Sequence, residues 1–436
     1  MSQVRVTPRM DSRMRRKHPS ERPSHGKKVL GGIEKKYSGG NNRLVRNRRY
    51  TNNMRLLHTA DWHVGSTLAG LDRFGETGKL LDELFAAAQT EKVDVVIVAG
   101  DVFDNPMPSN ISQKLVFDFF ARLSGAGIRS VVLAGNHDGQ VFVPSKSLLS
   151  LGTASVFEKP SGEQYQVGFR SRADEPVVVT ALPYPHERVV MKLNGAGDDI
   201  HGDYAGSVST FIRWLAGQMH ASDINIFAAH LMIAGAQLTD TERPMSVSPF
   251  FAVPAQSLPS STMYNALGHV HRHQQLVNAP TRSEYSGTIF RVNFSEEGTP
   301  KGFNLVDTDT RGNLTVQFCE LKSAIELHNV ECAVDDWANR LEPYRNRGYT
   351  KARIHADDPP FNLQGEIRAV CPWVVKVEFL RSEAATTTRP TIEALASTSL
   401  ETVQSMYRAY NGNATEDVMK VVGELFQEVT HADTDA

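Results

Sequence analysis

The stretches that decide the fold are VDVVIVAGDVFD (93–104) and RSVVLAGNHD (129–138). Each begins with a run of β-branched and apolar residues, which is typical of a strand buried on both faces. Each run ends in glycine followed by Asp, Asn or His. An amphipathic segment with helical spacing, residues 111–127, separates the two. This order predicts a parallel βαβ unit with polar residues just beyond the carboxyl ends of its strands.

The same alternation continues on both sides of this unit. It predicts a layered α/β sandwich in which five strand ends direct polar side chains toward one rim. Strands are expected at 56–63, 93–101, 129–138, 175–184, 224–231 and 264–271, and helices at 78–90, 111–127 and 207–220.

A second, smaller unit is expected after this sandwich. Residues 325–385 alternate between short strand and helix patterns, and EAATTTRP (383–390) resembles a linker. Two helices are predicted beyond the linker, at 391–410 and 415–430. In the second, apolar residues recur at helical spacing, and Thr415 is placed as its N-cap.

The formal net charge of -2 hides two unlike parts. Residues 1–53 contain 15 Lys or Arg and 3 Asp or Glu, whereas residues 54–436 contain 32 and 46. The first part lacks apolar periodicity and is therefore expected to be disordered. The favoured interpretation is that Met54 is the natural start of the protein, and the other is that residues 1–53 form a basic tail that binds nucleic acid.

Composition excludes several classes of protein. No apolar run approaches the roughly 18 residues of a membrane span, so an integral membrane protein is not expected. The 3 cysteines are widely spaced, which excludes a disulfide framework or a cysteine zinc site as the organising device. A reducing, cytoplasmic compartment is therefore expected.

The polar strand ends carry a set of metal-binding residue types. Carboxylate, imidazole and amide donors suit Mn²⁺, Fe²⁺ or Zn²⁺, and two such cations can clamp a phosphate during in-line attack. Alternation along a strand would let Asp61 act with His63, and His269 with His271 if the chain bends slightly. The motifs are D-x-H (61–63), G-D-x-x-D (100–104), G-N-H-D (135–138), His230 and G-H-x-H (268–271).

In this order the motifs resemble the calcineurin-like metallophosphoesterase superfamily, and within it the bacterial SbcD nuclease subunits. HTADWHVGSTL, LGHVHRHQ and EYSGTIFRVNFSEEGTPKGFNLVD (284–307) are close to that family's forms. The resemblance implies a four-layer β-sandwich flanked by helices, with a small α+β capping domain and C-terminal helices. The implied domains are the tail (1–53), a nuclease domain (54–322), a DNA-recognition cap (323–385), and a linker with docking helices (386–436).

The resemblance also implies the roles of the site residues. His137 would protonate the leaving oxygen or stabilise the transition state, and the Asp104 carboxylate would orient His137. The two divalent metal ions, by resemblance Mn²⁺, would share Asp101. One would be held by Asp61, His63, Asp101 and His271, and the other by Asp101, Asn136, His230 and His269.

The function that the resemblance implies is double-strand exonuclease and single-strand or hairpin endonuclease activity in DNA repair, replication and recombination. The implied partners are DNA and an SbcC-type coiled-coil ATPase, with a homodimer inside a heterotetramer. A stand-alone phosphoesterase acting on nucleotides or phosphoproteins is the alternative, but it leaves residues 284–430 without a role. A non-enzymatic scaffold is disfavoured by the complete ligand set.

Five other polar residues are given no primary role. His58 is expected to pack within its strand and His273 to face solvent. Asp138 is expected only to close its turn. Arg291 and Lys301 are either surface residues or contacts to DNA phosphate.

Overall fold

The computed structural model describes residues 53–138, 152–160, 165–187, 189, 204–242, 249–381, 400–404 and 415–432. The chain divides into a unit of Met1–Thr51 and a unit of Asn52–Ala436, and the described residues belong to the second. The predicted tail thus lies outside the described residues, apart from its last residue. No helix in the described ranges combines the length and apolar character needed to cross a membrane.

The first of two six-stranded sheets combines early strands with a late hairpin. β1, β4, β5 and β6 run parallel, and β13 and β14 return antiparallel beside β1. The sequence-distant segment after residue 300 therefore completes the same sheet as the first strand. From edge to edge the strands are β14 (Leu314–Glu320), β13 (Gly302–Thr308), β1 (Met54–Thr59), β4 (Val95–Val98), β5 (Arg129–Leu133) and β6 (Ala154–Phe157).

The second sheet is built from the middle of the chain. β8, β9, β10 and β12 run parallel, and the edge strands β7 and β11 pair antiparallel. In order the strands are β11 (Gln274–Gln275), β12 (Ser283–Tyr285), β10 (Tyr264–Gly268), β9 (Ile224–His230), β8 (Pro176–Leu182) and β7 (Gln166–Arg170).

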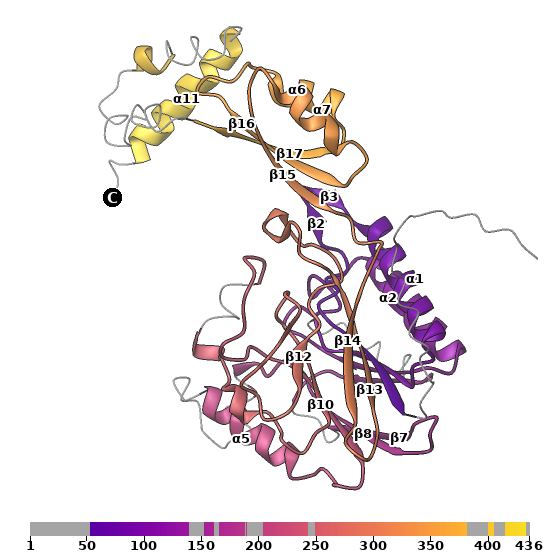
Figure 1. Ribbon diagram of the computed structural model, residues 1–436. Helices are drawn as coiled ribbons and strands as arrows, with labels where there is room; N and C mark the ends of the chain where they lie inside the picture. Colours follow the sequence, from indigo (N-terminus) through magenta and orange to yellow (C-terminus); the bar gives the residue numbers. More distant parts are fainter. Residues whose placement is uncertain are drawn as a thin grey trace, which may run out of the picture. The chain divides into compact units, whose positions relative to one another are not determined.

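Strand alternation assigns neighbouring residues to different cores. Leu56 and Ile226 lie in the core between the sheets. Leu57 faces the core shared with α1 and α2, and Phe227 faces the core shared with α5. The result is four layers, helix, sheet, sheet and helix, which confirms the predicted fold class (Figure 1). The helices are α1 (Phe74–Thr90), α2 (Asn110–Gly125) and α5 (Tyr204–Ala216).

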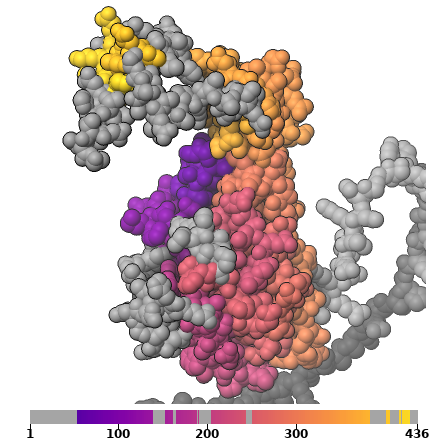
Figure 2. Space-filling view, turned by 90° about the vertical axis from the view of Figure 1, so that its left-hand side faces the viewer, coloured from indigo at the N-terminus to yellow at the C-terminus, as the bar shows by residue number. Residues whose placement is uncertain are grey.

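The two sheets draw on different parts of the sequence, yet their segments meet over one face. Figure 2 shows indigo and purple residues, from the early part of the chain, lying against rose residues from its middle. Parallel strands need long crossover connections, so neighbouring strands come from separated stretches of sequence. Residues from several such stretches can therefore converge on one site.

Three central strands end earlier than the apolar pattern predicts. β1 ends at Thr59, β4 at Val98 and β5 at Leu133, before the polar motifs begin. The chain leaves the sheet there with left-handed backbone, as at Asp61 (φ 51°) and Asp101 (φ 48°). The edge strands β6, β7 and β14 were not predicted. β6 has only 4 residues, and β7 and β14 are partly exposed, so each has only a weak apolar pattern.

A third sheet, with three parallel strands, forms after residue 326. The order is β15-β16-β17, with a helix following each of the first two strands. Val330, Ile354 and Ile367 lie in its own core. The elements are β15 (Leu327–Ala333), α6 (Trp337–Leu341), β16 (Tyr349–His355), α7 (Leu363–Val370) and β17 (Val374–Leu380).

The remaining described elements are short, except for one helix. α11 (Glu416–Ala432) begins directly after Thr415, as the sequence predicts. Of the helix predicted at 391–410, residues 400–404 are described and helical, and the rest lies outside the described residues. The short elements are the hairpin β2 (Thr67–Leu68) and β3 (Leu71–Asp72), and the 3-10 turns η2 (Pro249–Phe251), η3 (Ala255–Ser257), η4 (Phe294–Glu296) and η5 (Glu342–Tyr344).

Candidate metal centre

The carboxyl ends of five strands bring polar side chains to one rim of the sandwich. β1, β4 and β5 are neighbours in the first sheet, and β9 and β10 are neighbours in the second. Parallel strands end on the same edge, so residues after each strand meet there. Among the described residues three groups of possible ligand atoms form, with the atoms of each group within 4.8 Å of one another: Asp61, His63 and His271; Asp101, His230 and His269; and His63, Asp104 and His137.

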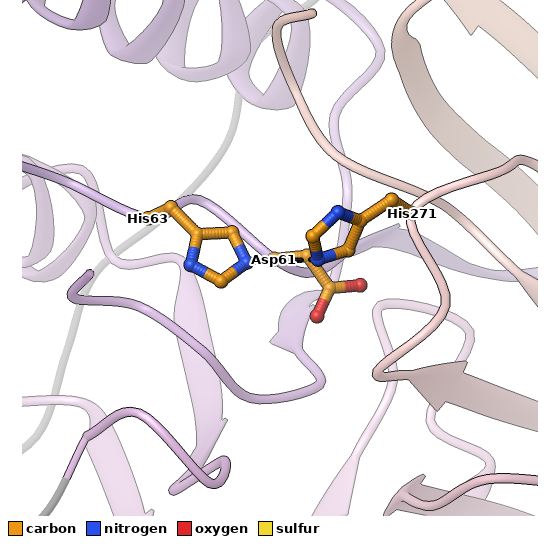
Figure 3. Close-up of side chains that lie close together, drawn as sticks. All are labelled: Asp61, His63 and His271. Carbon is orange, nitrogen blue, oxygen red and sulfur yellow. Dashed lines mark hydrogen bonds between the residues drawn. The ribbon is translucent and has the colours of Figure 1, made fainter. Parts of the chain in front are cut away.

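The first group consists of Asp61, His63 and His271, all buried. The Nε2 atoms of His63 and His271 lie 3.1 Å apart, and Figure 3 shows the two rings facing each other with the Asp61 carboxylate beside them. That carboxylate also accepts the backbone N–H of His269 at 3.0 Å. Asp61 therefore holds the turn of the G-H-x-H motif (268–271) and also offers an oxygen to the site.

The second group consists of Asp101, His230 and His269, with Asn136 beside them. The Asn136 Oδ1 atom lies 2.9 Å from His269 Nδ1 and 3.1 Å from His230 Nε2. The His230 Nδ1 atom lies 2.7 Å from the Ala99 carbonyl oxygen. A carbonyl only accepts, so Nδ1 carries the proton, and Nε2 is the atom that His230 offers to the site.

Asp101 lies between the two groups. Its Oδ2 atom is 3.3 Å from His230 Nε2 and 4.0 Å from His63 Nε2. Its other oxygen accepts the backbone N–H of His137 at 2.8 Å. A carboxylate in this position can reach a cation in either group. His269 and His271 fall into different groups, because the chain turns between them at His269 (φ 103°).

A left-handed backbone conformation orients Asp61 and His63, the two possible ligands of the D-x-H motif. Asp61 and His63 both have positive φ, at 51° and 42°. They lie beyond β1, so strand alternation is not what brings them together. Between them the buried Trp62 points away from the rim, where it stacks on Phe120 and donates its indole N–H to the Thr59 hydroxyl. This anchored Trp62 side chain holds the turn in which the two ligands share one side.

Glycine is required where the turns approach each other. A Cβ atom on Gly135 would lie 2.1 Å from Asp101 Oδ1 and 2.4 Å from the Asp101 backbone nitrogen. Gly135→Ala is expected to lower the free energy of unfolding by about 1–3 kcal/mol, since the G-N-H-D turn must move off Asp101. Urea unfolding measures this. Gly75→Ala in α1, where no atom lies within 4 Å of the added Cβ, should cost nothing. Equal stability of the two variants would contradict the close approach.

His137 lies at the solvent side of the centre. It is 9% exposed, whereas Asp61 and His230 are fully buried. Its Nδ1 atom lies 2.7 Å from the backbone carbonyl oxygen of Asp104, so Nδ1 carries the proton and Nε2 is left for the site. The Asp104 carboxylate also lies within 4.8 Å of a ring nitrogen of His137, in a group with His63. Asp104 acts on His137 through its backbone, and its carboxylate lies 3.6 Å from His63 Nδ1.

Asp138 does more than close its own turn. Its buried carboxylate accepts backbone N–H groups from Gly135 at 2.7 Å, Phe103 at 2.8 Å and Val102 at 3.2 Å. It thereby ties the turn after β5 to the turn after β4. Burial raises the pKa of Asp138 to about 7, with the charge of Asp101 adding to the effect. The fourth letter of G-N-H-D was the only sequence signal for this role.

Three further expectations about single residues were wrong. Lys301 is buried, with an ion pair to Glu296 at 2.9 Å. Arg291 is also buried, and its guanidinium donates to the Ala324 and Ile325 carbonyls. Neither is a surface cation. The ring of His273 is half-buried and stacks on Phe318, with centroids 4.0 Å apart.

His58 follows the prediction that it packs within its strand. It is fully buried, and its ring nitrogens lie 2.9 Å from the Tyr264 hydroxyl and 3.2 Å from the Leu267 carbonyl oxygen. Burial lowers the pKa of His58 to about 3, so the ring is neutral. Its role is therefore structural.

The electrostatics of the rim centre on one ion pair. Burial disfavours a charged Asp101, but His230 beside it holds the pKa of Asp101 well below its ordinary value. Burial likewise disfavours a charged His230, yet Asp101 raises the pKa of His230 to about 9. Burial raises the pKa of Asp61 well above its ordinary range and lowers that of His271. Divalent cations would stabilise the ionised carboxylates and the neutral imidazoles together.

The donor set fits a pair of divalent cations. Each group offers imidazole nitrogen and carboxylate oxygen, and the second adds an amide oxygen. These donors suit borderline to hard metal ions such as Mn²⁺, Fe²⁺ and Zn²⁺. Polar atoms this close in a buried site repel or compete with one another unless protons or cations lie between them.

Tyr184 also borders the centre and was not predicted. Its ring stacks on the His269 imidazole at a centroid distance of 5.7 Å. Burial raises the pKa of Tyr184 to about 12, so the phenol stays protonated. Thr241 and Glu242 were missed as well. Both contact His271, at 2.6 Å and 3.0 Å. No spacing rule points to such contacts between distant segments.

Comparison with known proteins places this centre in a family. Residues 54–242 match the model of the calcineurin-like phosphoesterases. The SbcD component of the nuclease SbcCD from Bacillus subtilis is 35% identical over 275 residues, which is 62% of this chain and 70% of the relative. Its Escherichia coli K12 counterpart is 31% identical over 276 residues, 60% of this chain and 66% of the relative.

Among solved structures, a dimetal phosphatase from Danio rerio is similar over 61% of this chain and 96% of its own length. The identity is 11% and the TM-score 0.37. The match to the Bacillus subtilis protein extends over 70% of its length. The chain therefore belongs to the SbcD family of SbcCD nuclease components, and its residues 54–242 form a calcineurin-like phosphoesterase domain.

Proposed function

We propose that this protein is the nuclease subunit of an SbcCD-type complex and hydrolyses DNA phosphodiester bonds at a dinuclear metal centre. The observation that carries the proposal is the pair of ligand groups joined by Asp101, with His137 at their open side. Membership in the SbcD family supports DNA as the substrate.

The proposed ligands divide between two cations. Asp61, His63, Asp101 and His271 would hold one, and Asp101, Asn136, His230 and His269 the other, with Mn²⁺ as the proposed metal. Bound there, the cations would supply Lewis-acid charge to the scissile phosphate and to the attacking water.

His137 is the proposed catalytic residue. The Nδ1–H group of His137 donates to the Asp104 carbonyl oxygen. The Nε2 atom of His137 is therefore the one that takes up and delivers a proton. As the most exposed of the histidines at the rim, it is placed to reach the leaving oxygen. Its backbone N–H, bonded to Asp101, keeps the ring at a fixed position relative to the metal ligands.

The roles proposed for the rest of the chain follow from the resemblance to the SbcD family. We propose that residues 54–322 form the nuclease domain, 323–385 a cap that recognises DNA, and 386–436 a linker and helices that dock on a coiled-coil ATPase of the SbcC type. A homodimer within a heterotetramer, acting in the cytoplasm in DNA repair, replication and recombination, completes the proposal. Residues 54–436 carry 32 basic and 46 acidic side chains, so much of the affinity for the DNA backbone is assigned to the partner.

Digestion of linear and hairpin DNA with Mn²⁺ tests the proposal. The full chain should degrade linear duplexes from their ends and open hairpins when the ATPase partner and ATP are present. A chelator should abolish both reactions. If nucleotides or phosphopeptides are hydrolysed with the partner absent while DNA is left intact, the stand-alone phosphoesterase is the correct function.

The exposed stripe of α11 gives a sharper test of docking. Val418, Val421 and Leu425 recur along one side of the helix and are 39%, 51% and 55% exposed. Val421→Asp and Leu425→Asp are each expected to weaken binding of the ATPase by roughly tenfold or more, because buried apolar anchors dominate interface energies. Titration by calorimetry measures this. Lys420→Asp, on another side of α11, is the control, and an equal loss there would contradict docking through the stripe.

A further inference from the structure

The segment 284–307 contains a buried ion pair to which the proposed mechanism gives no role. The side chains of Glu296 and Lys301 are 0% and 1% exposed, and Lys301 Nζ lies 2.9 Å from Glu296 Oε1. Burying two charges costs free energy that their attraction only partly returns, so such a pair is weak evidence for stability. Its contacts point to a different purpose.

Both members of the pair act on the metal ligand His271. Lys301 Nζ donates to the His271 carbonyl oxygen at 3.3 Å and to the Thr288 hydroxyl at 2.7 Å, so all three of its protons are used. Glu296 Oε1 accepts from the Thr241 hydroxyl at 3.3 Å. That hydroxyl lies 2.6 Å from His271 Nδ1. The pair therefore contacts His271 at its backbone and, through Thr241, at its ring.

These contacts select one tautomer of His271. The Thr241 hydroxyl has a single proton, which is directed to Glu296 Oε1 or to the Thr239 hydroxyl 2.5 Å away. Its oxygen is then left to accept a proton from His271 Nδ1. The Nε2 atom, which faces His63, is thereby left without a proton. A neutral imidazole in this form is the one that binds a metal ion.

The backbone of His271 is held from the same segment. Thr288 N–H donates to the His271 carbonyl oxygen at 3.1 Å. Gly287, with φ 73°, makes this approach possible, because a Cβ there would lie 2.6 Å from that oxygen. The segment around residues 284–301 thus supports His271 through its backbone as well as through its ring.

We propose that Glu296, Lys301 and Thr241 are positioning residues that fix the His271 ring for metal binding. They set the affinity of the group formed by Asp61, His63 and His271 for its divalent cation, and leave the group around His230 and His269 unaffected. This inference rests on the dinuclear centre of the proposed function. It also gives segment 284–307 a chemical role.

Metal binding by the full chain tests the inference without any measurement of DNA cleavage. Thr241→Val keeps the shape of the side chain and removes the hydroxyl. It is expected to weaken one of two Mn²⁺ binding events by roughly 10- to 100-fold in calorimetry, the usual effect of losing a hydrogen bond to a metal ligand. Thr241→Ser restores the hydroxyl and should restore the affinity. With Co²⁺ as probe, the absorption of one site should change and that of the other should stay.

Lys301→Met is the second variant, because it removes the charge at similar length. It should show the same selective loss of one Mn²⁺ site. Two controls separate positioning from general destabilisation. Arg73→Met breaks the equally buried ion pair with Glu76, which does not touch a ligand, and Thr262→Val removes a buried hydroxyl elsewhere. Both controls should bind two Mn²⁺ ions with unchanged affinity.

The outcomes are distinct. If the wild-type protein binds two Mn²⁺ ions and Thr241→Val binds both with wild-type affinity, the inference is overturned and the proposed function stands. If Thr241→Val and the controls weaken both ions equally, the role of Thr241 is general stability and the inference is again overturned. A wild-type protein that binds no pair of ions overturns the proposed function and, with it, the inference.

Discussion

Replacing His137 with Ala is expected to lower the rate of DNA cleavage by roughly 10²- to 10⁴-fold, the range in which a positioned general acid contributes. The imidazole is the only part removed, and the backbone N–H of residue 137 still donates to Asp101. Divalent cation binding should therefore be unchanged. Single-turnover cleavage of a labelled duplex and Mn²⁺ calorimetry measure the two effects.

The matched control for this variant is His220→Ala, since His220 is exposed and lies after α5, in a different part of the fold. It should cleave DNA at the wild-type rate. Cleavage that survives in His137→Ala would show that another group protonates the leaving oxygen. A parallel loss of Mn²⁺ binding would show instead that His137 is needed to build the metal centre.

Replacing Asp101 with Asn should have the larger effect on metal binding. The Asp101 carboxylate lies between the two ligand groups, and the substitution keeps its shape while removing its charge. Both cations should bind more weakly, and cleavage should fall by about 10³-fold or more, because metal charge at the phosphate contributes several kcal/mol to the transition state. Calorimetry with Mn²⁺ and the cleavage assay measure this.

Asp118→Asn on α2 is the control for this second variant. Its side chain is 58% exposed and pairs with Lys114 on the same helix. Such a pair contributes little, so metal binding and cleavage should both stay at the wild-type level. If Asp101→Asn lost only one of the two Mn²⁺ ions, Asp101 would belong to one group and would not bridge them.

The candidate site was largely predictable because each ligand ends or follows a strand. Apolar runs such as VVIV (95–98) are strong local signals, and the polar residue after each run needs no tertiary information to be noticed. Reasoning from strand patterns gave the wrong backbone conformation at Asp61 and His63. Strand alternation placed them on one side, whereas left-handed turns beyond β1 do so in the structure.

Other parts of the site depend on contacts between distant segments. Asp138 bonds to residues 102 and 103, and Thr241 meets both His271 and Glu296. Lys301 has the charge and length of a surface residue in the sequence, and only the packing of its segment around His271 buries it. A hydrogen bond between residues 30 or more positions apart produces no periodic pattern in the amino-acid sequence.

The sequence by itself determined the layered α/β fold, the order of the strands that bear ligands, and the residue types at the rim. These follow from local patterns, namely buried apolar runs of about strand length that end in glycine and polar residues. Only the tertiary structure decided which ligands share a group, which tautomers of His137 and His230 face the centre, and which residues support His271. The physical reason is that these features depend on distances of about 3–4 Å between segments separated along the chain, and local patterns do not specify such distances.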